Sequence, residues 1–566
     1  MDSILSGRQL VICCDGTNNN LTGNTNDTNV VKLAQLLAQF PSAEASQMVF
    51  YDPGVGNPGE LPGATWADGI SRWAQRVAGL AFGRGVYENM ADCYLFLMRH
   101  YHPGDQIYIF GFSRGAFTAR SVAGLVNQFG VLRSHMESML PTLIHTYFSD
   151  RELKQDKITA IAKQASELFA NAASRVVEIQ FVGVWDTVAS VGMGPFSARI
   201  TALPTIKDKR FLNVRQALAL DEQRAQFKPR LYVDNNGTYE TSTKKPATIQ
   251  QLWFRGAHCD VGGGFVWGQT GISDRALCWL VSEAVQCGLA LQRDGVPLDS
   301  EATMASAFAN AIKADATPIV HSQLYTSPLW ALTGMAVRNT QKVALDSGES
   351  YAVQPVEHAS VTEHEYHFPQ NTVWSKSRPV QGVVIGVVAV LLLMLAHGEA
   401  LNAAPFAWPL DGRAIAIRIG DDFAQNAAFA RWQLQWWQAA SLNSVPAHFG
   451  STLWALAWDT GLIAAYAYVL SWFAVGAFAR QARLRRVTQT PARWLNTLGW
   501  ALPVAVGGDL AENLASLLVL WCHTQGNGVL AVVWACAMTL FSLTKWVGLL
   551  GVLLLIVLPA WQPSQR

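Results

Sequence analysis

Short apolar runs that end in turn-forming residues recur along the first part of the chain, with helical patterns between them. Such a run is typical of a buried strand in a parallel sheet, whereas apolar residues spaced three and four apart predict a helix. The predicted strands are residues 9–15, 47–51, 106–110, 177–185 and 249–255. The predicted helices are residues 29–40, 86–101, most of 116–173, and 274–288. This alternation predicts an α/β domain whose parallel sheet is flanked by helices.

The pattern changes at Val380, where long apolar segments begin. Four of them approach the length needed to cross a bilayer, although charges interrupt the last two. They are residues 380–396, 461–478, 495–521 and 529–558. We therefore expect a catalytic domain over residues 1–375, with its core at about 8–290, and an all-α transmembrane region over residues 376–566.

Composition supports a part of the chain that lies in lipid. Only 15% of the 566 residues are charged and 21 are tryptophan, against roughly 25% charged residues in soluble domains. Trp432, Trp436 and Trp437 suit an interfacial helix or aromatic belt. The net charge of +1 gives no reason to expect nucleic acid. The eight cysteines have no paired spacing, which argues against zinc and disulfides.

Basic residues predict how the chain is oriented in a membrane. Arginines crowd the loop after the second predicted span, and Lys376 and Arg378 precede the first. The positive-inside rule places both regions, and with them the catalytic domain, in the cytoplasm of the producing cell. The N-terminus shows no signal-peptide pattern. We therefore expect the chain to cross a membrane several times, with the catalytic domain on the cytoplasmic side.

The strand at residues 106–110 leads into Gly111-Phe112-Ser113-Arg114-Gly115, which begins a predicted helix. This G-x-S-x-G pattern is that of a nucleophile elbow, where a sharp turn exposes the serine and the glycines permit strained backbone and close packing. Ser113 could instead simply cap the helix. The preceding strand and the flanking glycines favour the nucleophile.

Two more polar residues follow predicted strands, Asp186 after residues 177–185 and His258 after residues 249–255. The carboxyl ends of parallel strands meet at one edge of a sheet. A serine hydroxyl needs a base to take its proton, and that base needs an acid to orient it. The chain order Ser113, Asp186, His258 is the order of α/β hydrolases. The sequence predicts an α/β-hydrolase-like domain with these three catalytic residues.

Each of these residues also has a non-catalytic interpretation. Asp186 could cap a turn through Thr187, and His258 could be a buried structural histidine. The three glycines at 262–264 favour a loop that presents the imidazole. Asp260 is the second candidate for the acid, but it lies only two residues from His258 and would need an unusual turn to reach the ring.

The oxyanion of such a reaction needs backbone N–H donors. Arg114, next to the nucleophile, supplies one, and Gly16 and Thr17 after the first strand are candidates for the second. Asp15 at the head of this loop also fits a phosphatase or metal site, but no carboxylate cluster accompanies it. The predicted reaction needs no cofactor and no metal. The other acidic groups near strand ends are interpreted as structural: Asp52 in a turn, and Asp221, Glu222 and Arg224 as an ion-pair group.

Three charges lie within the last two apolar segments: Asp509, Glu512 and Lys545. Charges at such depth are costly unless they are paired or hydrated. Two antiparallel neighbouring helices would bring Lys545 near Asp509, which predicts an ion pair that locks the hairpin. The alternative is that both segments are broken and the charges lie at the membrane surface.

Seven short blocks occur in order over about residues 8–288. They are Asp15-Gly16-Thr17-x-Asn19, Tyr51-Asp52-x-Gly54-Val55-Gly56, Pro103-Gly104-Asp105, Gly111 to Arg120, Gly183 to Val188, Ala217 to Arg224, and Gly256 to Gly264. Together they resemble the catalytic domain of type VI secretion phospholipase effectors, also described as an uncharacterised α/β-hydrolase domain. The resemblance implies lipolytic ester hydrolysis with Ser113, Asp186 and His258, bacterial origin with the bacterial inner membrane as location, and delivery into a rival's envelope. It also implies secretion machinery or a cognate immunity protein as partner.

The sequence thus predicts a membrane-anchored serine lipase or phospholipase that acts on lipid at the bilayer surface, with residues 59–85 as a lid. Two alternatives remain. The tail could disrupt or organise membranes while the hydrolase fold only binds, or the enzyme could be an esterase or thioesterase for a soluble acyl substrate.

Overall fold

The computed structural model describes residues 8–16, 26–40, 46–54, 84–148, 155–188, 190–191, 198–199, 211–232, 248–266, 268–307, 318–340, 342–344, 350–352, 355–363, 366, 386–387, 445–488 and 493–557. The chain divides into two compact units. The first comprises residues 1–322 and 338–369, and the second comprises residues 323–337 and 370–566. A short segment of the predicted catalytic domain, Gln323–Val337, thus belongs to the second unit.

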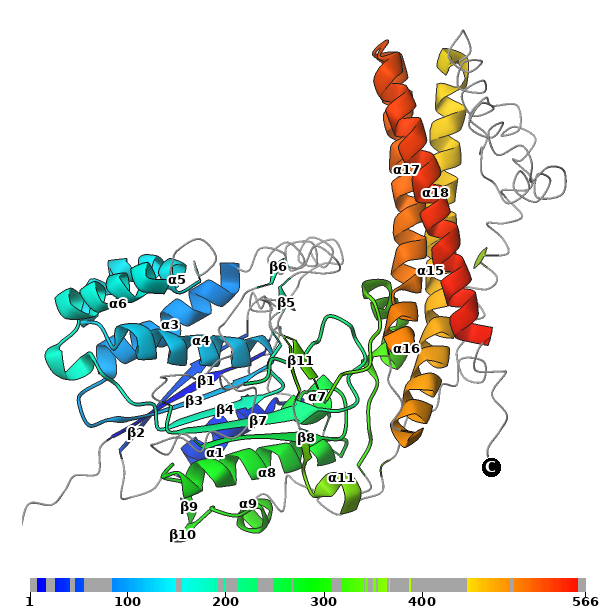
Figure 1. The fold of residues 1–566 in the computed structure, drawn as a ribbon. Coiled ribbons are helices and arrows are strands. Elements are labelled where there is room, and N and C mark those ends of the chain that lie inside the picture. The colour runs from blue at the N-terminus through cyan, green and yellow to red at the C-terminus, as the bar shows by residue number, and fades with distance from the viewer. Residues whose placement is uncertain are drawn as a thin grey trace, which may run out of the picture. The chain divides into compact units, whose positions relative to one another are not determined.

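A seven-stranded parallel sheet forms the centre of the first unit (Figure 1). Its strand order is β13-β8-β7-β4-β3-β1-β2, and every neighbouring pair is parallel. The predicted α/β sheet flanked by helices is therefore confirmed. The strands are β1 Gln9–Cys14, β2 Gln47–Asp52, β3 Gln106–Phe112, β4 Phe181–Trp185, β7 Asn213–Ala219, β8 Thr248–Phe254 and β13 Val356–Glu357.

Helices cover both faces of this sheet (Figure 1). On one face lie α3 Arg84–His100, α4 Arg114–Phe129, α5 Leu140–Phe148 and α6 Gln155–Phe169; on the other lie α1 Asn29–Gln39 and α8 Gly271–Gln286. Shorter elements are η1 Ser134–Met139, η2 Ala172–Ser174, α7 His258–Gly262, α9 Glu301–Ala307, α11 Ser360–Glu363, and the strand pairs β5 Ser190–Val191 with β6 Ala198–Arg199, β9 Gln292–Arg293 with β10 Val296–Pro297, and β11 Lys342–Ala344 with β12 Ser350–Ala352.

Alternate residues of the central strands enter two different cores. In β1, Leu10 and Ile12 pack with α3 and α4, whereas Val11 and Cys13 pack with α1 and α8. Successive side chains of a strand point to opposite faces, so a strand covered on both sides is apolar throughout. This explains why the central strands read as short continuous apolar runs in the sequence.

The carboxyl edge of the sheet brings the candidate residues together. From β1 the chain first adds β2 at one side of this strand and then adds β3 at its other side. The direction in which strands are added to the sheet therefore reverses between β1 and β3. Ligands of open parallel sheets bind at this switch point. Ser113 follows β3 there, beside the loop that begins at Asp15. Phe112 pairs with Trp185, so Asp186 directly follows the neighbouring strand end.

The second unit is helical. It contains α10 Gln323–Thr326, η4 Pro328–Thr333, α15 Val445–Thr488, α16 Arg493–Leu498, α17 Ala501–Thr524 and α18 Gly528–Val557. By length and composition, two helical stretches of the described chain could cross a bilayer: Asp459–Ala482 and Leu540–Val557. α17, at the third predicted span, is not among them. The first predicted span and Trp432, Trp436 and Trp437 lie outside the described residues.

Small residues let α17 and α18 approach closely. A Cβ on Gly548 would lie 2.3 Å from the backbone nitrogen of Ala505, and one on Gly508 would lie 2.7 Å from that of Lys545. Beside this contact, Lys545 Nζ lies 2.9 Å from Asp509 Oδ1 and 2.7 Å from Glu512 Oε2. The predicted pairing of Lys545 with Asp509 is confirmed, and Glu512 joins it.

Replacing Lys545 with methionine should destabilise this helix hairpin, because two buried carboxylates would lose their cation. Breaking a buried pair from one side costs about 3 kcal/mol or more. We expect the full-length Lys545→Met variant in detergent to unfold at a clearly lower temperature or denaturant concentration than the unmodified protein, whereas Thr544→Ala, at the adjacent half-buried position, should change little. Equal resistance of Lys545→Met and the unmodified protein would show that the pair does not lock the hairpin.

Candidate active site

Ser113 occupies a strained turn between β3 and α4. Its backbone φ is 59° and ψ is −120°, and the only other non-glycine residues of the described chain with positive φ are Asp186 and Asp294. Such strain costs roughly 1–3 kcal/mol and collects at functional sites. The following helix lies very close to β1, since a Cβ on Gly115 would be 2.3 Å from the carbonyl oxygen of Asp15. Glycine at 115 is therefore required by this approach.

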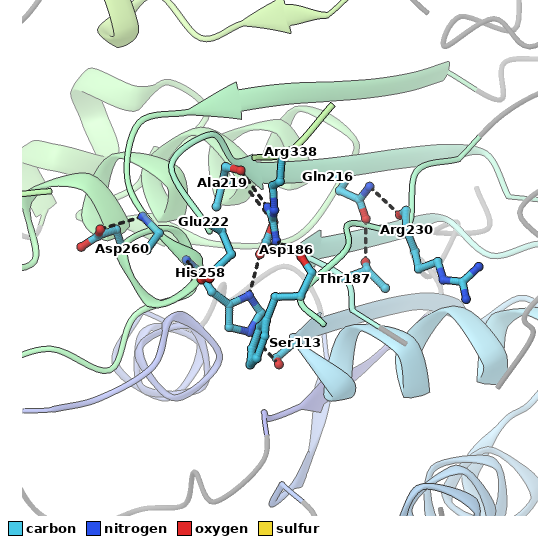
Figure 2. A network of polar contacts seen from close by, with 12 residues as sticks. Ser113, Asp186, Thr187, Gln216, Ala219, Glu222, Arg230, His258, Asp260 and Arg338 are labelled. Carbon is cyan, nitrogen blue, oxygen red and sulfur yellow. Dashed lines mark hydrogen bonds and ion pairs between the residues drawn. The ribbon is translucent and has the colours of Figure 1, made fainter. Parts of the chain in front are cut away.

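Three candidate residues from distant parts of the chain meet at this turn (Figure 2). His258 Nε2 lies 2.7 Å from Ser113 Oγ, and His258 Nδ1 lies 2.5 Å from Asp186 Oδ2. The side chains of Asp186 and His258 are buried and Ser113 is 8% exposed. With Nδ1–H donating to Asp186, Nε2 is free to accept the Ser113 proton. The arrangement can convert the hydroxyl into a nucleophile.

The loop that carries His258 is held by its neighbours. Gly256 has a φ of 98°, which favours glycine. The N–H of Ala257 donates to Asp260 Oδ2 (2.8 Å) at the start of α7. The His258 N–H donates to Glu222 Oε2 (3.2 Å), and the ring packs against Phe227. These contacts fix the backbone and the ring together.

Asp260, the second candidate for the acid, faces a different histidine. Its carboxylate accepts from the His321 N–H (2.9 Å), and Oδ1 lies 2.5 Å from His321 Nδ1. Phe265 stacks on the His321 ring. Asp260 thus fastens the loop, while Asp186 contacts His258.

Two acids and two arginines are buried around the imidazole. Glu222 pairs with Arg224 (2.8 Å), and although burial opposes it, this pairing lowers the pKa of Glu222 to about 2. Burial of Asp186 is outweighed by Arg338 and His258, which lower its pKa. Burial lowers the pKa of His258 itself, partly offset by Asp186. The His258 imidazole is therefore neutral at neutral pH, and the Asp186 and Glu222 carboxyl groups are ionised.

Of the three residues predicted to donate to an oxyanion, Arg114 and Gly16 lie within the described residues. Arg114 is the first residue of α4, where backbone N–H groups have no partner within the helix. The N–H of Gly16 donates to Asp15 Oδ1 (2.6 Å), and Thr17 lies outside the described residues, as do residues 59–83 of the predicted lid. The second donor stays a prediction.

The polar loop after β1 is built around Asp15, whose carboxylate also accepts from Thr28 (2.9 Å) and Tyr51 (2.8 Å). Burial raises the pKa of Asp15 to about 6 despite these donors. Within the described residues, one other group could hold a metal: Cys14, Asp52 and Cys93, with the two Sγ atoms 3.6 Å apart. It offers three ligand atoms. The hydrogen bond with Cys93, together with burial, raises the pKa of the Cys14 thiol, and burial raises the pKa of the Cys93 thiol. This suits two protonated core thiols that share a hydrogen bond.

Three features of the site escape sequence-based prediction. Arg338 donates hydrogen bonds to both carboxylate oxygens of Asp186. Glu222 accepts from the backbone N–H of His258. Beside Asp186, the Thr187 hydroxyl donates to the side-chain oxygen of Gln216 (2.6 Å). The sequence gives a weak indication of Glu222, because this residue lies in one of the seven blocks that resemble the family. It gives no indication of Arg338, since this residue follows no strand and lies in a stretch without a clear pattern.

Comparisons with known proteins relate part of this chain to others. Residues 8–283 match the family described as "T6SS, Phospholipase effector Tle1-like, catalytic domain". An uncharacterized protein of Saccharomyces cerevisiae, YEL023C, is 34% identical over 228 residues, which is 39% of this chain and 32% of that protein. The chain thus spans about a third of the length of this curated relative.

A solved structure of an uncharacterized protein from Pseudomonas aeruginosa is also similar. It is 20% identical and covers 58% of this chain and 53% of that one, with a TM-score of 0.29. Residues 8–283 of this chain are thus similar to T6SS phospholipase effector Tle1-like catalytic domains, the family that the seven sequence blocks also resemble.

Proposed function

We propose that this chain is a membrane-anchored serine hydrolase with an α/β-hydrolase-like catalytic domain, which cleaves acyl ester bonds of phospholipids. One observation carries the proposal: Ser113 Oγ, both ring nitrogens of His258 and the Asp186 carboxylate form a continuous hydrogen-bonded chain of 2.7 and 2.5 Å. The match of residues 8–283 to a family of phospholipase effector catalytic domains supports the choice of substrate.

In the proposed reaction, Ser113 Oγ attacks the ester carbonyl carbon while His258 Nε2 takes its proton. The Arg114 N–H, at the N-terminus of α4, stabilises the oxyanion. His258 then protonates the departing lysophospholipid alcohol, leaving an acyl group on Ser113. Water, deprotonated by His258, releases the fatty acid and restores the serine. Asp186 keeps the imidazole in the required tautomer throughout.

Membrane attachment is supported by the second unit. Large apolar side chains of its helices face outward, among them Leu514 at 58%, Leu540 at 62% and Val547 at 67% exposure, whereas the charged Lys545 and Asp509 lie inside. An apolar outside around a polar inside suits lipid rather than water. We propose the inner membrane as its location and, from the family, delivery to a rival cell as its use.

The pH dependence of the reaction should reflect the lowered pKa of His258. The base works only when neutral, so a lowered pKa keeps it active below its ordinary value of 6.5. We expect kcat/KM on a soluble short-chain ester to stay constant from pH 8 to 6.5 and to fall only at lower pH. A fall in kcat/KM on the acidic side of the pH profile with its midpoint above pH 6.5 would contradict this description of the site.

The reaction is tested with full-length protein and phospholipid vesicles that carry an entrapped dye. The proposal predicts release of fatty acid and lysophospholipid, with any dye leakage following hydrolysis. Dye leakage equal for the unmodified protein and Ser113→Ala, with no fatty acid released, would contradict it and favour a membrane-disrupting tail. Hydrolysis of soluble esters or thioesters alone would favour the third alternative.

A further inference from the structure

Arg338 makes four hydrogen bonds at the acid of the proposed site. Its guanidinium donates to both Asp186 oxygens, from Nη1 to Oδ1 (2.6 Å) and from Nη2 to Oδ2 (2.8 Å). It also donates to the carbonyl oxygens of Ala219 and Phe227, at 2.7 Å each. The Arg338 side chain is 4% exposed. Figure 2 shows Arg338 and His258 both directed at the one carboxylate.

We propose that Arg338 is a positioning residue for hydrolysis at Ser113: it fixes the plane of the Asp186 carboxylate so that Oδ2 stays on His258, and it balances the carboxylate charge. This inference rests on the proposed function. Residue 338 lies beyond residue 283, where the match to the phospholipase family ends. The catalytic centre is thus completed by a part of the chain outside that match.

The planar fork of arginine suits this task. A bidentate arginine restrains a carboxylate in two directions, which a single ammonium cannot do. Asp186 needs such restraint, because its own φ is 42° and, among the described residues, its carboxylate otherwise accepts from His258 and from the N–H of Ala219 (3.0 Å). The carbonyls of Ala219 and Phe227 hold the guanidinium in turn. Arg338 is therefore fixed by backbone groups, and Asp186 is fixed by Arg338.

The charges around His258 give Arg338 a second effect. The charged groups that face the imidazole from the packed elements are Asp186, Glu222, Arg224 and Arg338, while Asp260 and His321 pair further along the loop. The two acids and two arginines balance, so the site is neutral when His258 is neutral. Removing Arg338 leaves a net negative charge beside the imidazole, which favours the imidazolium form and blocks the base.

Arg338→Met and Arg338→Lys test this role, with Arg215→Met as a matched control. Arg215 is likewise a buried arginine paired with a carboxylate, at 2.6 Å from Glu283, but it lies on β7 and its partner lies on α8. For each full-length variant we would measure the melting temperature, and kcat and KM on a soluble ester from pH 5 to 9.

For Arg338→Met we expect kcat at pH 7 to fall about 10²–10³-fold, less than the roughly 10⁴-fold of losing the acid. KM should change little, and the acid limb should move upward by about one pH unit. In Arg338→Lys, the acid limb of the pH profile should lie where it does in the unmodified protein, because lysine keeps the positive charge. Its kcat should recover only in part, because lysine lacks the planar guanidinium that binds both carboxylate oxygens. Arg215→Met should lose stability and keep both kinetic values.

An unchanged acid limb in Arg338→Met, with a kcat no lower than that of Arg215→Met, would overturn the inference while leaving the proposed function intact. If Arg338→Met does not fold, Arg338→Lys is used for the test. Full activity of Arg338→Lys would show that bidentate binding of Asp186 is not needed, and would overturn the inference. Equal hydrolysis by the unmodified protein and Ser113→Ala would instead overturn the proposed function, and the role of Arg338 with it.

Discussion

Replacing Ser113 with alanine should reduce fatty acid release from phospholipid vesicles by about 10⁴-fold or more, because no other group can form the acyl intermediate. The turn itself should survive, since the Ser113 side chain makes no capping hydrogen bond to α4. The melting temperature should therefore stay within a few degrees of the unmodified value. Loss of activity together with loss of folding would not identify the nucleophile.

Ser121 provides the matched control. It lies on α4, the helix that follows the turn at Ser113, its side chain is fully buried, and its Oγ has no hydrogen-bond partner in the described chain. Ser121→Ala removes a serine hydroxyl from this neighbouring helix and leaves the contact between Ser113 and His258 in place. We expect it to hydrolyse vesicles at the unmodified rate. A loss equal to that of Ser113→Ala would mean that the assay reports on the helix rather than on the nucleophile.

Replacing Asp186 with asparagine should lower kcat by about 10⁴-fold, because the amide no longer selects the tautomer that leaves Nε2 free to take the Ser113 proton. The substitution also removes a charge from Arg338, which would remain buried without its carboxylate. Asp186→Asn should therefore melt at a lower temperature than Ser113→Ala. Both kcat on a soluble ester and the melting temperature should be measured.

Asp274→Asn separates the catalytic loss from the cost of breaking a buried ion pair. Asp274 pairs with Lys32 at 2.6 Å and is as deeply buried as Asp186, but its partner is not a histidine. We expect this variant to lose stability and to keep its kcat below its melting temperature. If Asp186→Asn and Asp274→Asn lost activity to the same extent, Asp186 would be structural.

Much of the catalytic unit could be predicted from the hydrophobic pattern. The predicted strands at 9–15, 47–51, 106–110 and 249–255 agree with β1, β2, β3 and β8 to within two residues. The prediction over 177–185 begins four residues before β4, which starts at Phe181. Strands buried on both faces leave a clear apolar run, and turn residues mark where each one ends.

β7 escaped prediction because two polar residues occupy its centre. Arg215 and Gln216 are buried, and they are satisfied by Glu283 on α8 and by Gln251 on β8, far away in the sequence. No local pattern reveals such partners, so the strand does not read as an apolar run. β13, with two residues, is too short to carry any pattern.

For the candidate site, too, some residues could be predicted from the sequence and others could not. Ser113, Asp186 and His258 follow strands, so their order and position pointed to them. Arg338 reaches the site from a stretch without strand or helix periodicity, and only tertiary structure places its guanidinium on Asp186. Local sequence patterns thus indicate the residues at strand ends, and long-range ion pairs are found only in the folded chain.

The most direct test of the central proposal is to locate the nucleophile by covalent labelling. The full-length protein is incubated with a fluorophosphonate, which reacts with activated serines, and the modified peptide is identified by mass spectrometry. We predict one adduct, on Ser113, which disappears when His258 is replaced with alanine although Ser113 is still present. An adduct on another residue, or fatty acid release that continues undiminished in Ser113→Ala, would contradict the proposal.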